Sequence, residues 1–330
     1  MRITGLLRPK SSDKFVLNIS MKKENRRSFI KQSALAATAC LVPMEIKTKN
    51  QISKISHRTI PSTGEQIPAI GLGSWLTFDV GSSPSEIQPV KSVIKSFYEA
   101  GGRLIDSSPM YGRSEQAIGQ AASELGLTDK LWMITKVWTS GENQGKSQIE
   151  NSKTLFKTWP KLLQVHNLQD MKTHLKTLRA LKAEGKIKYI GLTHYLNSAH
   201  DQLASLIKSE KPDFIQVNLS IRNTAAEDYL IPLAADHGVA VIINRPLETG
   251  ALFNAIGNAS LPSWAGEYGI KTWAAYFLKY LVSNKNITCV IPATRREAHV
   301  KENMEGGMGK MPNQNEREKM ADYFRSIAKP

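Results

Sequence analysis

Short apolar runs alternate with segments of helical periodicity along most of this chain, and this alternation constrains its fold more than any other feature. In 171–184, Met171, Leu175, Leu178 and Leu181 recur at helical spacing, and Gly185 follows as a stop signal. The short runs are almost continuously apolar, which is typical of parallel strands buried on both faces. The predicted strands occupy residues 69–72, 103–106, 131–135, 161–166, 187–192, 213–218, 239–243 and 288–291.

Eight strand–helix repeats predict an α/β fold, a closed (β/α)8 TIM barrel. A short β-hairpin around Ser62-Thr63-Gly64-Glu65 precedes the barrel, and an extra C-terminal helix ends it. An open doubly wound sheet is disfavoured because the first turn, Gly71-Leu72-Gly73, lacks the third glycine of a dinucleotide-binding fingerprint. The predicted helices span 86–100, 112–126, 146–157, 171–184, 199–209, 226–237 and 268–283, with a final pair at 295–303 and 315–328.

The net charge of +15 is concentrated near the N-terminus. Residues 1–58 contain 13 Lys and Arg against 3 Asp and Glu, so a net charge of only +5 remains for 59–330. No clustered basic face is visible in that body, and the sequence does not predict nucleic-acid binding. No run approaches the ~18 consecutive apolar residues of a membrane-spanning helix, so no transmembrane segment is predicted in the mature protein.

The N-terminal segment has the layout of an export signal. The basic run 25–31 contains Arg26-Arg27-Ser28-Phe29, which resembles a twin-arginine signal, and a weakly apolar run follows at 34–42. We therefore expect the twin-arginine export machinery to deliver the protein to the periplasm; if the segment is only a basic tail, the location is cytoplasmic. Cys40 resembles a lipoprotein acceptor site, which makes a lipid anchor there an alternative.

These features predict three parts. An N-terminal extension and signal peptide occupies 1–43, with its true start at Met1 or Met21. A polar linker follows at 44–57, and the barrel spans 58–330.

Polar residues close three consecutive predicted strands. Asp106, Lys136 and His166 end the second, third and fourth strands, and Tyr111 follows Asp106 by five residues. Because the carboxyl ends of barrel strands converge on the face that holds the active site, we expect these four side chains to meet. Together they suit proton transfer. No metal site is predicted, because the Lys136 ammonium between Asp106 and His166 would repel a cation.

Several sequence blocks, in the correct order, resemble the aldo–keto reductase family over about 58–328. The resemblance implies a (β/α)8 barrel that binds an extended nicotinamide dinucleotide and reduces an aldehyde or ketone, including sugar-like carbonyls, to the alcohol by hydride transfer. The blocks are Ile70-Gly71-Leu72-Gly73-Ser74-Trp75, the run 105–115 with Asp106-Ser107-Ser108-Pro109-Met110-Tyr111-Gly112, Ile134-Thr135-Lys136, Leu162-Leu163-Gln164-Val165-His166, Gly185–Leu192, Ile291-Pro292-Ala293-Thr294 and Glu302-Asn303.

The resemblance implies that Asp106, Tyr111, Lys136 and His166 form a catalytic tetrad. Tyr111 would donate the proton, but a free phenol has a pKa of about 10 and is a weak acid at neutral pH. Lys136 is expected to lower that pKa, and Asp106 to hold the lysine through an ion pair. His166 would orient the carbonyl oxygen and share in proton transfer.

The resemblance also implies cofactor contacts. Thr193, His194 and Gln216 match the residues that hold the nicotinamide carboxamide, although His194 replaces the family's Asn. Arg245 follows Asn244 where many members place a stacking tyrosine, and 247–252 resembles the segment that covers the pyrophosphate. The full predicted set is Gly73, Ser74, Thr193, His194, Gln216, Arg245, Leu247, Gly250, Leu252, Thr294, Arg295, Glu302 and Asn303.

The choice of cofactor depends on the segment 293–299. Ala293 and His299 stand where many NADPH-specific members have Lys and Arg, but Arg295 and Arg296 can replace the lost charge because Arg suits bidentate phosphate contacts. We therefore expect NADP(H) to be favoured, with NAD(H) as the alternative.

Two tryptophans are expected in the substrate pocket. Trp75 and Trp138 follow the first and third strands and are predicted to form apolar walls for a small-molecule carbonyl substrate. A hypothesis of a different class is an exported nucleotide-binding barrel that senses redox state or serves a partner with little turnover. Export favours it, because the extracytoplasmic space lacks an obvious supply of reduced nicotinamide; the intact tetrad argues against it.

Overall fold

The computed structural model describes residues 54–329. The predicted signal peptide at 1–43, including Cys40, and the predicted linker up to residue 53 lie outside the described residues. The end of the predicted linker already belongs to the folded body. Ile55 is buried and forms a β-bridge with Met308, so the body begins a few residues before the predicted boundary at 58.

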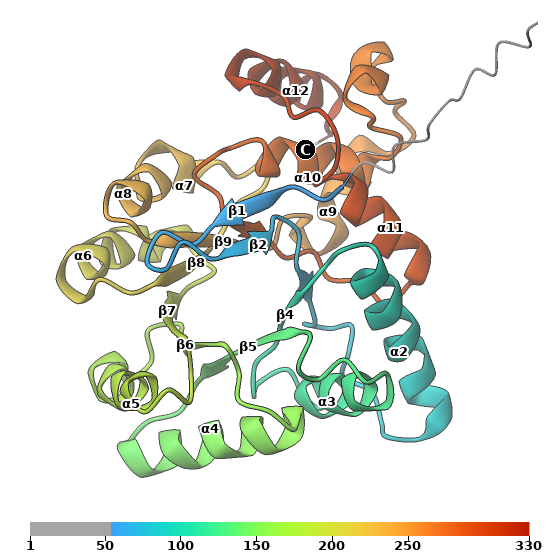
Figure 1. The fold of residues 1–330 in the computed structure, drawn as a ribbon. Coiled ribbons are helices and arrows are strands. Elements are labelled where there is room, and N and C mark those ends of the chain that lie inside the picture. Colours follow the sequence, from blue (N-terminus) through green and yellow to red (C-terminus); the bar gives the residue numbers. More distant parts are fainter. Residues whose placement is uncertain (1–53, 330) are drawn as a thin grey trace, which may run out of the picture. The chain divides into compact units, whose positions relative to one another are not determined.

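Eight parallel strands, hydrogen-bonded in chain order, surround the centre of the fold (Figure 1). Backbone hydrogen bonds close the cylinder between its first and last strands: the amides of Gly71 and Gly73 donate to the carbonyls of Val290 and Pro292, each at 2.9 Å. The predicted (β/α)8 barrel is therefore confirmed. The strands are β3 (Leu72–Gly73), β4 (Leu104–Asp106), β5 (Trp132–Val137), β6 (Leu162–His166), β7 (Tyr189–Thr193), β8 (Phe214–Asn218), β9 (Ala240–Asn244) and β10 (Cys289–Val290).

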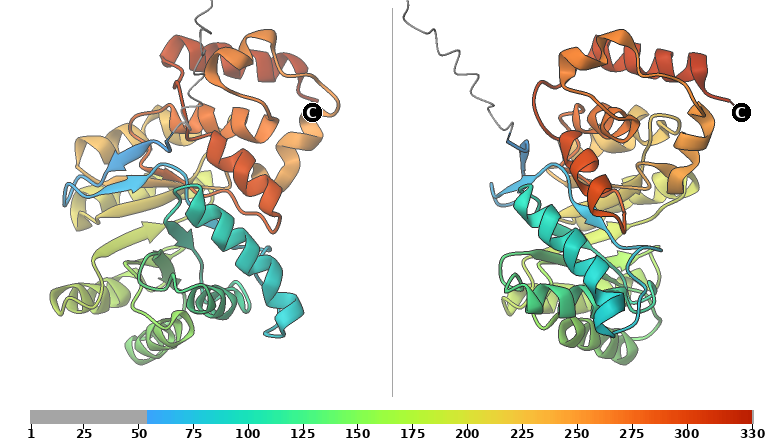
Figure 2. Two further views of the ribbon diagram at one scale, coloured as in Figure 1. Left: turned by 45° about the vertical axis from the view of Figure 1, so that its right-hand side comes forward. Right: turned by 90° about the vertical axis from the view of Figure 1, so that its right-hand side faces the viewer.

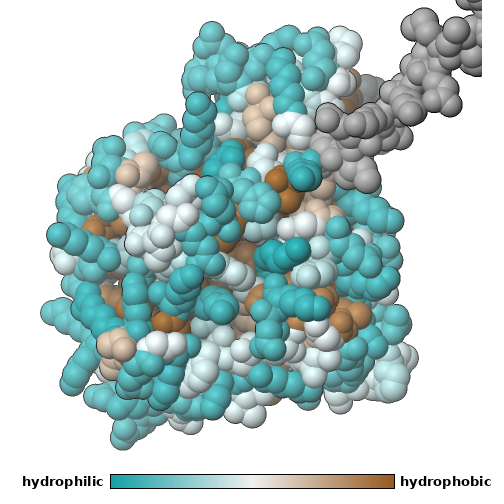
Figure 3. All heavy atoms as spheres, viewed as in Figure 1, coloured by the Kyte–Doolittle hydropathy of each residue, from teal (hydrophilic) through white to brown (hydrophobic). Residues whose placement is uncertain are grey.

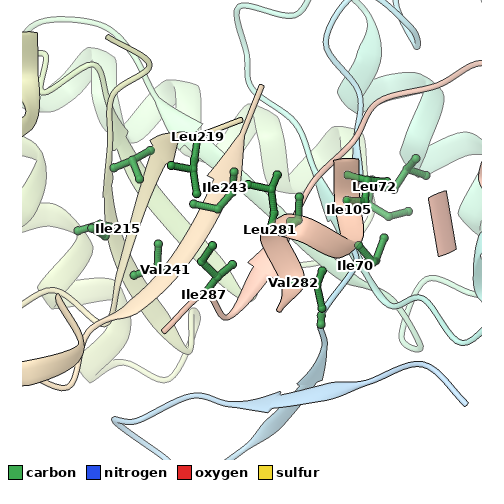
Figure 4. Packing of buried hydrophobic residues seen from close by; sticks show 14 of the residues in the cluster. Ile70, Leu72, Ile105, Ile215, Leu219, Val241, Ile243, Leu281, Val282 and Ile287 are labelled. Carbon is green, nitrogen blue, oxygen red and sulfur yellow. The ribbon is translucent and has the colours of Figure 1, made fainter. Parts of the chain in front are cut away.

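Helices surround the strands and pack on their outward side chains (Figure 2). Figure 4 shows this apolar layer, in which Ile243 of β9 lies close to Leu281 of the helix that precedes β10. The helices are α2 (Pro84–Glu99), α3 (Ser114–Glu124), α4 (Glu142–Phe156), α5 (Met171–Ala183), α6 (His200–Glu210), α7 (Ala225–Asp228), α8 (Leu230–Asp236), α9 (Ala251–Ile256), α10 (Trp273–Val282), α11 (Glu297–Glu305) and α12 (Gln314–Ile327), the predicted extra C-terminal helix.

Three predicted segments differ from the structure. The predicted helix at 226–237 divides at Tyr229, whose backbone is not helical, into α7 and α8. The predicted helix at 268–283 begins only at Trp273, because Thr272 caps it by accepting from the Ala275 amide at 3.2 Å. The segment 247–252, expected to cover the pyrophosphate as a loop, instead contains the short 3-10 turn η2 (Glu248–Gly250) and the start of α9.

The predicted hairpin is present and closes one end of the barrel. Its strands β1 (His57–Thr59) and β2 (Gln66–Pro68) are antiparallel. The Tyr189 hydroxyl at the start of β7 lies 2.7 Å from both the Glu65 carboxylate and the Thr63 hydroxyl, so the hairpin is attached to the strand by hydrogen bonds. The hairpin residues Ile60 and Ile67 are fully buried against the barrel interior.

The barrel interior changes from apolar to polar along β4, β5, β6 and β8, whereas β9 keeps the apolar Ile242 two residues after Ala240. Next to the hairpin, inward positions are apolar: Leu104, Ile134, Leu162, Tyr189 and Phe214. Two residues further along each strand, inward positions become Asp106, Lys136, Gln164, Gly191 and Gln216. Because inward residues alternate along a strand, the sequence thus forms an apolar lower layer and a polar upper layer in one barrel.

The face seen in Figure 3 is mostly hydrophilic, with apolar side chains in small separate patches. In the described part of the chain, no helix is both long enough and apolar enough to cross a membrane.

Candidate active site

Lys136 and Asp106 form a buried ion pair in the upper layer. Lys136 Nζ lies 2.8 and 2.9 Å from the two Asp106 oxygens and donates to the Ser107 carbonyl at 2.7 Å. Burial alone would lower the pKa of Lys136. The Asp106 carboxylate and Tyr111 together have a larger, opposite effect, so the pKa lies above the ordinary value for lysine and the side chain stays charged. Burial raises the pKa of Asp106 and the ammonium opposes that rise. The two short contacts hold the groups as an ion pair at neutral pH.

Tyr111 lies beside this ion pair, on the loop between β4 and α3. Lys136 Nζ stands 4.9 Å from the centroid of its ring. Burial raises the pKa of the Tyr111 hydroxyl; Lys136 lowers it as expected, but burial has the larger effect. The expectation of a lowered pKa is therefore wrong for the protein without a ligand. The phenol remains protonated at neutral pH, which is the state a proton donor requires.

His166 faces Tyr111 from the end of β6, with its ring centroid 6.0 Å from that of Tyr111. Burial, followed by the charge of Lys136, lowers the pKa of His166 to about 3, so the imidazole is neutral at physiological pH. Its Nδ1 atom lies 3.1 Å from the Ser108 hydroxyl. If Ser108 donates to Nδ1, then Nε2 carries the hydrogen and can donate to an oxygen atom of a ligand. Sequence reasoning did not identify Ser108 as a partner of His166.

Two buried glutamines, Gln164 and Gln216, belong to the same layer. Gln164 Nε2 donates to Gln216 Oε1 at 2.7 Å, and the Gln216 side chain acts to lower the pKa of Asp106. Because the Gln216 oxygen faces Gln164, its NH2 group is the end available to the carboxylate. Gln164 was not predicted, although its inward position between Leu162 and His166 is the signal that could have identified it.

The predicted catalytic residues open into one large cavity at the carboxyl ends of the strands. Its volume is about 1170 Å³, and Asp106, Tyr111, Lys136 and His166 all line it. This volume exceeds the ~300–1,000 Å³ typical of a site for one small ligand, so a dinucleotide and a second molecule have room together. The structure therefore brings the four predicted residues to one face of one cavity.

The family assignment follows from the sequence profile that matches residues 69–312, that of the aldo/keto reductase family. This chain belongs to the aldo/keto reductase family. The match covers the strands that carry Asp106, Lys136 and His166 and the loop that carries Tyr111. The protein is accordingly an NAD(P)H-dependent oxidoreductase.

Individual relatives of this reductase are distant. A probable voltage-gated potassium channel subunit beta of Arabidopsis thaliana is 22% identical over 303 residues, which cover 76% of this chain and 90% of the relative. The NADH-specific methylglyoxal reductase of Escherichia coli K12 is 26% identical over 246 residues, or 64% and 73% of the two chains. A Klebsiella pneumoniae aldo/keto reductase, crystallised with NADP and acetate, superimposes with a TM-score of 0.67 at 22% identity, over 79% of this chain and 93% of that one.

Most of the predicted cofactor contacts line the same cavity. This holds for eleven residues: Gly73, Ser74, Thr193, Gln216, Arg245, Leu247, Gly250, Thr294, Arg295, Glu302 and Asn303. His194 and Leu252 are not among the lining residues. The His194 ring is stacked on Tyr195, with its Nδ1 accepting from the Leu196 amide at 3.2 Å, and Leu252 is fully buried in the core because α9 begins there. Arg296 also lies outside the lining, so Arg295 is the arginine of this pair that faces the cavity.

The lining fits an extended dinucleotide. It runs from the polar layer at β4–β6 to α11 and includes the cations Arg245 and Arg295, which suit phosphates. Asn244 also lines the cavity, and its Oδ1 atom is buried without a hydrogen-bond partner in the described part of the chain. A buried acceptor of this kind is normally satisfied, so Asn244 is suited to receive a hydrogen bond from a bound ligand.

The segment after β9 has a strained backbone and is held in place by side-chain contacts. Arg245, Glu248 and Thr249 have backbone φ angles of 52°, 48° and 58°, in the left-handed region that disfavours residues with side chains. Glu248 accepts hydrogen bonds from Ser220 and forms an ion pair with Arg222, both on the loop after β8. These contacts hold a strained segment over the cavity, which is typical of backbone that shapes a binding site.

The two predicted pocket tryptophans also lie at the cavity. Trp75 is 43% exposed and Trp138 is 42% exposed, and both line its mouth. Sequence reasoning did not single out the neighbouring mouth residues Leu76 and Tyr195. Among residues 54–329, no cluster of three or more His, Cys, Asp or Glu side chains is arranged to hold a metal ion.

Proposed function

We propose that this reductase uses NADPH to reduce an aldehyde or ketone to the alcohol, with Tyr111 as the proton donor. When bound, the dinucleotide supplies the hydride that adds to the carbonyl carbon. The observation that carries the proposal is the placement of Tyr111, the Lys136–Asp106 ion pair and neutral His166 on one wall of a cavity large enough for both ligands.

The residues divide the chemistry between them. Hydride addition builds negative charge on the carbonyl oxygen, and preorganised donors stabilise that charge. Neutral His166 donates a hydrogen bond to this oxygen and orients it. Tyr111 transfers its hydroxyl proton to the oxygen, and the nearby Lys136 ammonium stabilises the phenolate that forms. Asp106 fixes the ammonium in position through both of its oxygens. Solvent then reprotonates the phenolate.

The change of Tyr111 to Phe tests the acid role. Tyr111→Phe removes the transferable proton and leaves the ring in place, so kcat should fall by roughly 10²–10⁴-fold, the usual contribution of a positioned acid. The dissociation constant for NADPH, measured by quenching of tryptophan fluorescence, should stay within about threefold of the original value. Tyr229→Phe is the matched control, because Tyr229 is exposed and lies outside the cavity lining. A Tyr111→Phe protein that keeps most of its turnover would exclude the proposed role.

NADPH is proposed as the preferred cofactor on two grounds. Arg295 lines the end of the cavity near Glu302 and Asn303, where the family places the adenosine, and the Klebsiella pneumoniae structure was determined with NADP. NADPH and NADH should both be tested, because the E. coli relative is named as NADH-specific. Arg295→Ala should weaken NADPH binding at least about tenfold and NADH binding far less, since a charge-assisted contact is worth ~1.5–3 kcal/mol. Equal weakening of NADPH and NADH binding would contradict a contact between Arg295 and the 2′-phosphate of NADPH.

As a second candidate function, the protein binds the nucleotide and acts on a partner, with little catalytic turnover of its own. The relative named as a potassium channel subunit is the observation that favours it. Nucleotide binding without reduction of any carbonyl, by a protein with an intact Tyr111, would support this candidate over the first.

Export by the twin-arginine machinery to the periplasm is proposed from Arg26-Arg27-Ser28-Phe29 and the weakly apolar run after it. Arg26→Lys with Arg27→Lys should leave the protein in the cytoplasm, whereas the unchanged chain should appear in the periplasmic fraction. Cytoplasmic retention of both would reject export. Mass spectrometry of the exported chain would show whether Cys40 carries lipid.

A further inference from the structure

Glu115 is a buried carboxylate to which the proposed reaction gives no role. It lies in the first turn of α3, is 1% exposed and does not line the cavity. A carboxylate loses favourable hydration when it enters the protein interior, so it is seldom fully buried unless hydrogen bonds or charges compensate. The groups that compensate Glu115 therefore indicate what this side chain does.

Two hydroxyl groups bind the two oxygens of this carboxylate. The Thr135 hydroxyl donates to Oε1 at 2.5 Å, and the Ser152 hydroxyl donates to Oε2 at 3.0 Å. Both residues are fully buried; Thr135 belongs to β5 and Ser152 belongs to α4. Glu115 thus joins α3 to one strand and to one helix, with a separate oxygen atom for each link.

Close packing of α3 on α4 fixes the position of the carboxylate. Gly119 follows Glu115 by four residues and lies on the same face of α3. A side chain at Gly119 would collide with the backbone carbonyl of Leu155, in the turn of α4 that follows Ser152. The two helices approach this closely because residue 119 has no side chain. Helix packing therefore holds Glu115 within reach of Ser152.

The link to Thr135 leads directly to Lys136. Side chains alternate between the two faces of a strand, so Thr135 points outward to the helices while Lys136 points inward to the cavity. Burial raises the pKa of Glu115, and the two hydroxyl hydrogen bonds, followed by the charge of Lys136, oppose that rise. The carboxylate and the ammonium thus lie on opposite faces of one strand and attract each other.

A second link joins α3 to Tyr111. Ser114, the residue before Glu115, is fully buried. Its hydroxyl donates to the Tyr111 carbonyl at 2.7 Å, and its amide donates to the same carbonyl at 3.2 Å. The backbone of Tyr111 is therefore fixed to the first turn of α3, and Glu115 fixes that turn to the residue before Lys136. This chain of contacts connects the proton donor to the ammonium outside the cavity.

We propose that Glu115 is a positioning residue that sets the separation between the Tyr111 hydroxyl and the Lys136 ammonium. It does so by tying α3 to the strand residue next to the lysine, Thr135. The inference rests on the proposed function, in which the ammonium stabilises the phenolate that Tyr111 leaves. A misplacement of about 1 Å, even from a change far from the reacting atoms, can lower a rate on the order of 100-fold.

The test compares the two hydroxyl groups that bind the same carboxylate. Thr135→Val removes the link to β5, whereas Ser152→Ala removes the link to α4, which carries no member of the tetrad. Each change leaves one carboxylate oxygen without its donor, so both should lower the melting temperature. We expect kcat to fall at least about tenfold in Thr135→Val and to stay within about twofold in Ser152→Ala. Equal losses of kcat would overturn the inference, since they would indicate a structural role alone.

Substrate and cofactor binding should be spared in Thr135→Val. The dissociation constant for NADPH and the KM for the aldehyde should stay within about threefold of the original values. The loss of kcat should be the same for 2-naphthaldehyde and glyceraldehyde, which differ in size and polarity, because the tetrad acts on the carbonyl group that they share. A loss confined to one aldehyde, or a loss of NADPH binding alone, would contradict a positioning role.

Glu115→Gln distinguishes the hydrogen bonds from the charge. Glutamine keeps one oxygen and adds an NH2 group, and a hydroxyl can bond to either, so both links can persist and kcat should stay within about threefold. Glu115→Ala removes both links and should lose at least as much activity as Thr135→Val. A loss in Glu115→Gln as large as that in Glu115→Ala would overturn positioning by these links.

The outcomes also separate this inference from the proposed function. Unchanged kcat in Thr135→Val would overturn the role of Glu115 and leave carbonyl reduction intact. Failure of the unchanged protein to reduce either aldehyde, with NADPH bound, would reject both. Turnover that survives Tyr111→Phe would reject the proposed acid role, and with it the need to hold Tyr111 beside the ammonium.

Discussion

The two layers of the barrel interior come from the same strands but serve different purposes. In the lower layer, inward residues such as Leu104 and Phe214 pack on the hairpin in a closed apolar core. In the upper layer, two residues further along β4, β5, β6 and β8, lie a buried ion pair and two glutamines, of which the ion pair and Gln216 line a cavity. Burying charge costs free energy that apolar packing does not. The lower layer therefore supplies stability, and the upper layer depends on that stability to hold its reactive groups in place.

Removing one charge from the upper layer should have the largest effect. Lys136→Met leaves Asp106 buried without its partner, which should destabilise the fold by about 3–5 kcal/mol and lower kcat by at least ~10²-fold. The double variant Lys136→Met with Asp106→Leu should recover much of the stability and none of the activity. Urea unfolding and NADPH consumption measure the two quantities. Recovery of activity in the double variant would contradict the division between the layers.

A cavity in the lower layer should change stability alone. Phe214 is fully buried, and its ring lies edge-on to Tyr189 with centroids 5.3 Å apart. Phe214→Ala should lower the free energy of unfolding by about 3–5 kcal/mol. The kcat of the folded fraction, measured well below the melting temperature, should stay within about threefold because the tetrad is left intact. A larger loss of kcat would show that the layers are coupled.

The neutral state of His166 should appear as a pH dependence of stability. Its pKa is about 3 in the folded protein, against about 6.5 in an unfolded chain. As the pH falls below 6.5 the unfolded chain takes up a proton that the folded one does not, so stability is lost by about 1.4 kcal/mol per pH unit. Between about pH 7.5 and pH 5, the protein should lose roughly 2 kcal/mol more than His166→Asn does. Equal losses would mean that His166 takes up a proton as readily in the folded protein as in the unfolded chain.

The barrel could be predicted because the periodicity of apolar residues is a local property of the sequence. All eight strands and the extra helix α12 lie within a few residues of their predicted positions. Strand ends also placed Asp106, Lys136 and His166 at one face, since parity along a strand fixes which side chains point inward. The sequence did not predict the interruption at Tyr229 or the start of α9 at Ala251, because both depend on backbone angles set by tertiary contacts.

The site was predicted less completely at its edges. His194 and Leu252 were placed in the cofactor site by resemblance, but the stacking of His194 on Tyr195 and the burial of Leu252 direct them elsewhere. The direction of the Tyr111 pKa was also missed, because the sequence shows the neighbouring lysine but not the burial that outweighs it. The partners Ser108 and Gln164 depend on distances across the barrel that no local pattern encodes.

We propose that Tyr111 and the neighbouring Lys136–Asp106 ion pair promote the conversion of NADPH and a carbonyl compound into NADP⁺ and an alcohol. The most direct measurement follows deuterium from NADPH labelled at nicotinamide C4 into the alcohol formed from 2-naphthaldehyde, by mass spectrometry. We expect one deuterium on the carbinol carbon with the unchanged protein and almost no product with Tyr111→Phe. Alcohol formed without deuterium from either labelled face, or formed equally well by Tyr111→Phe, would contradict it.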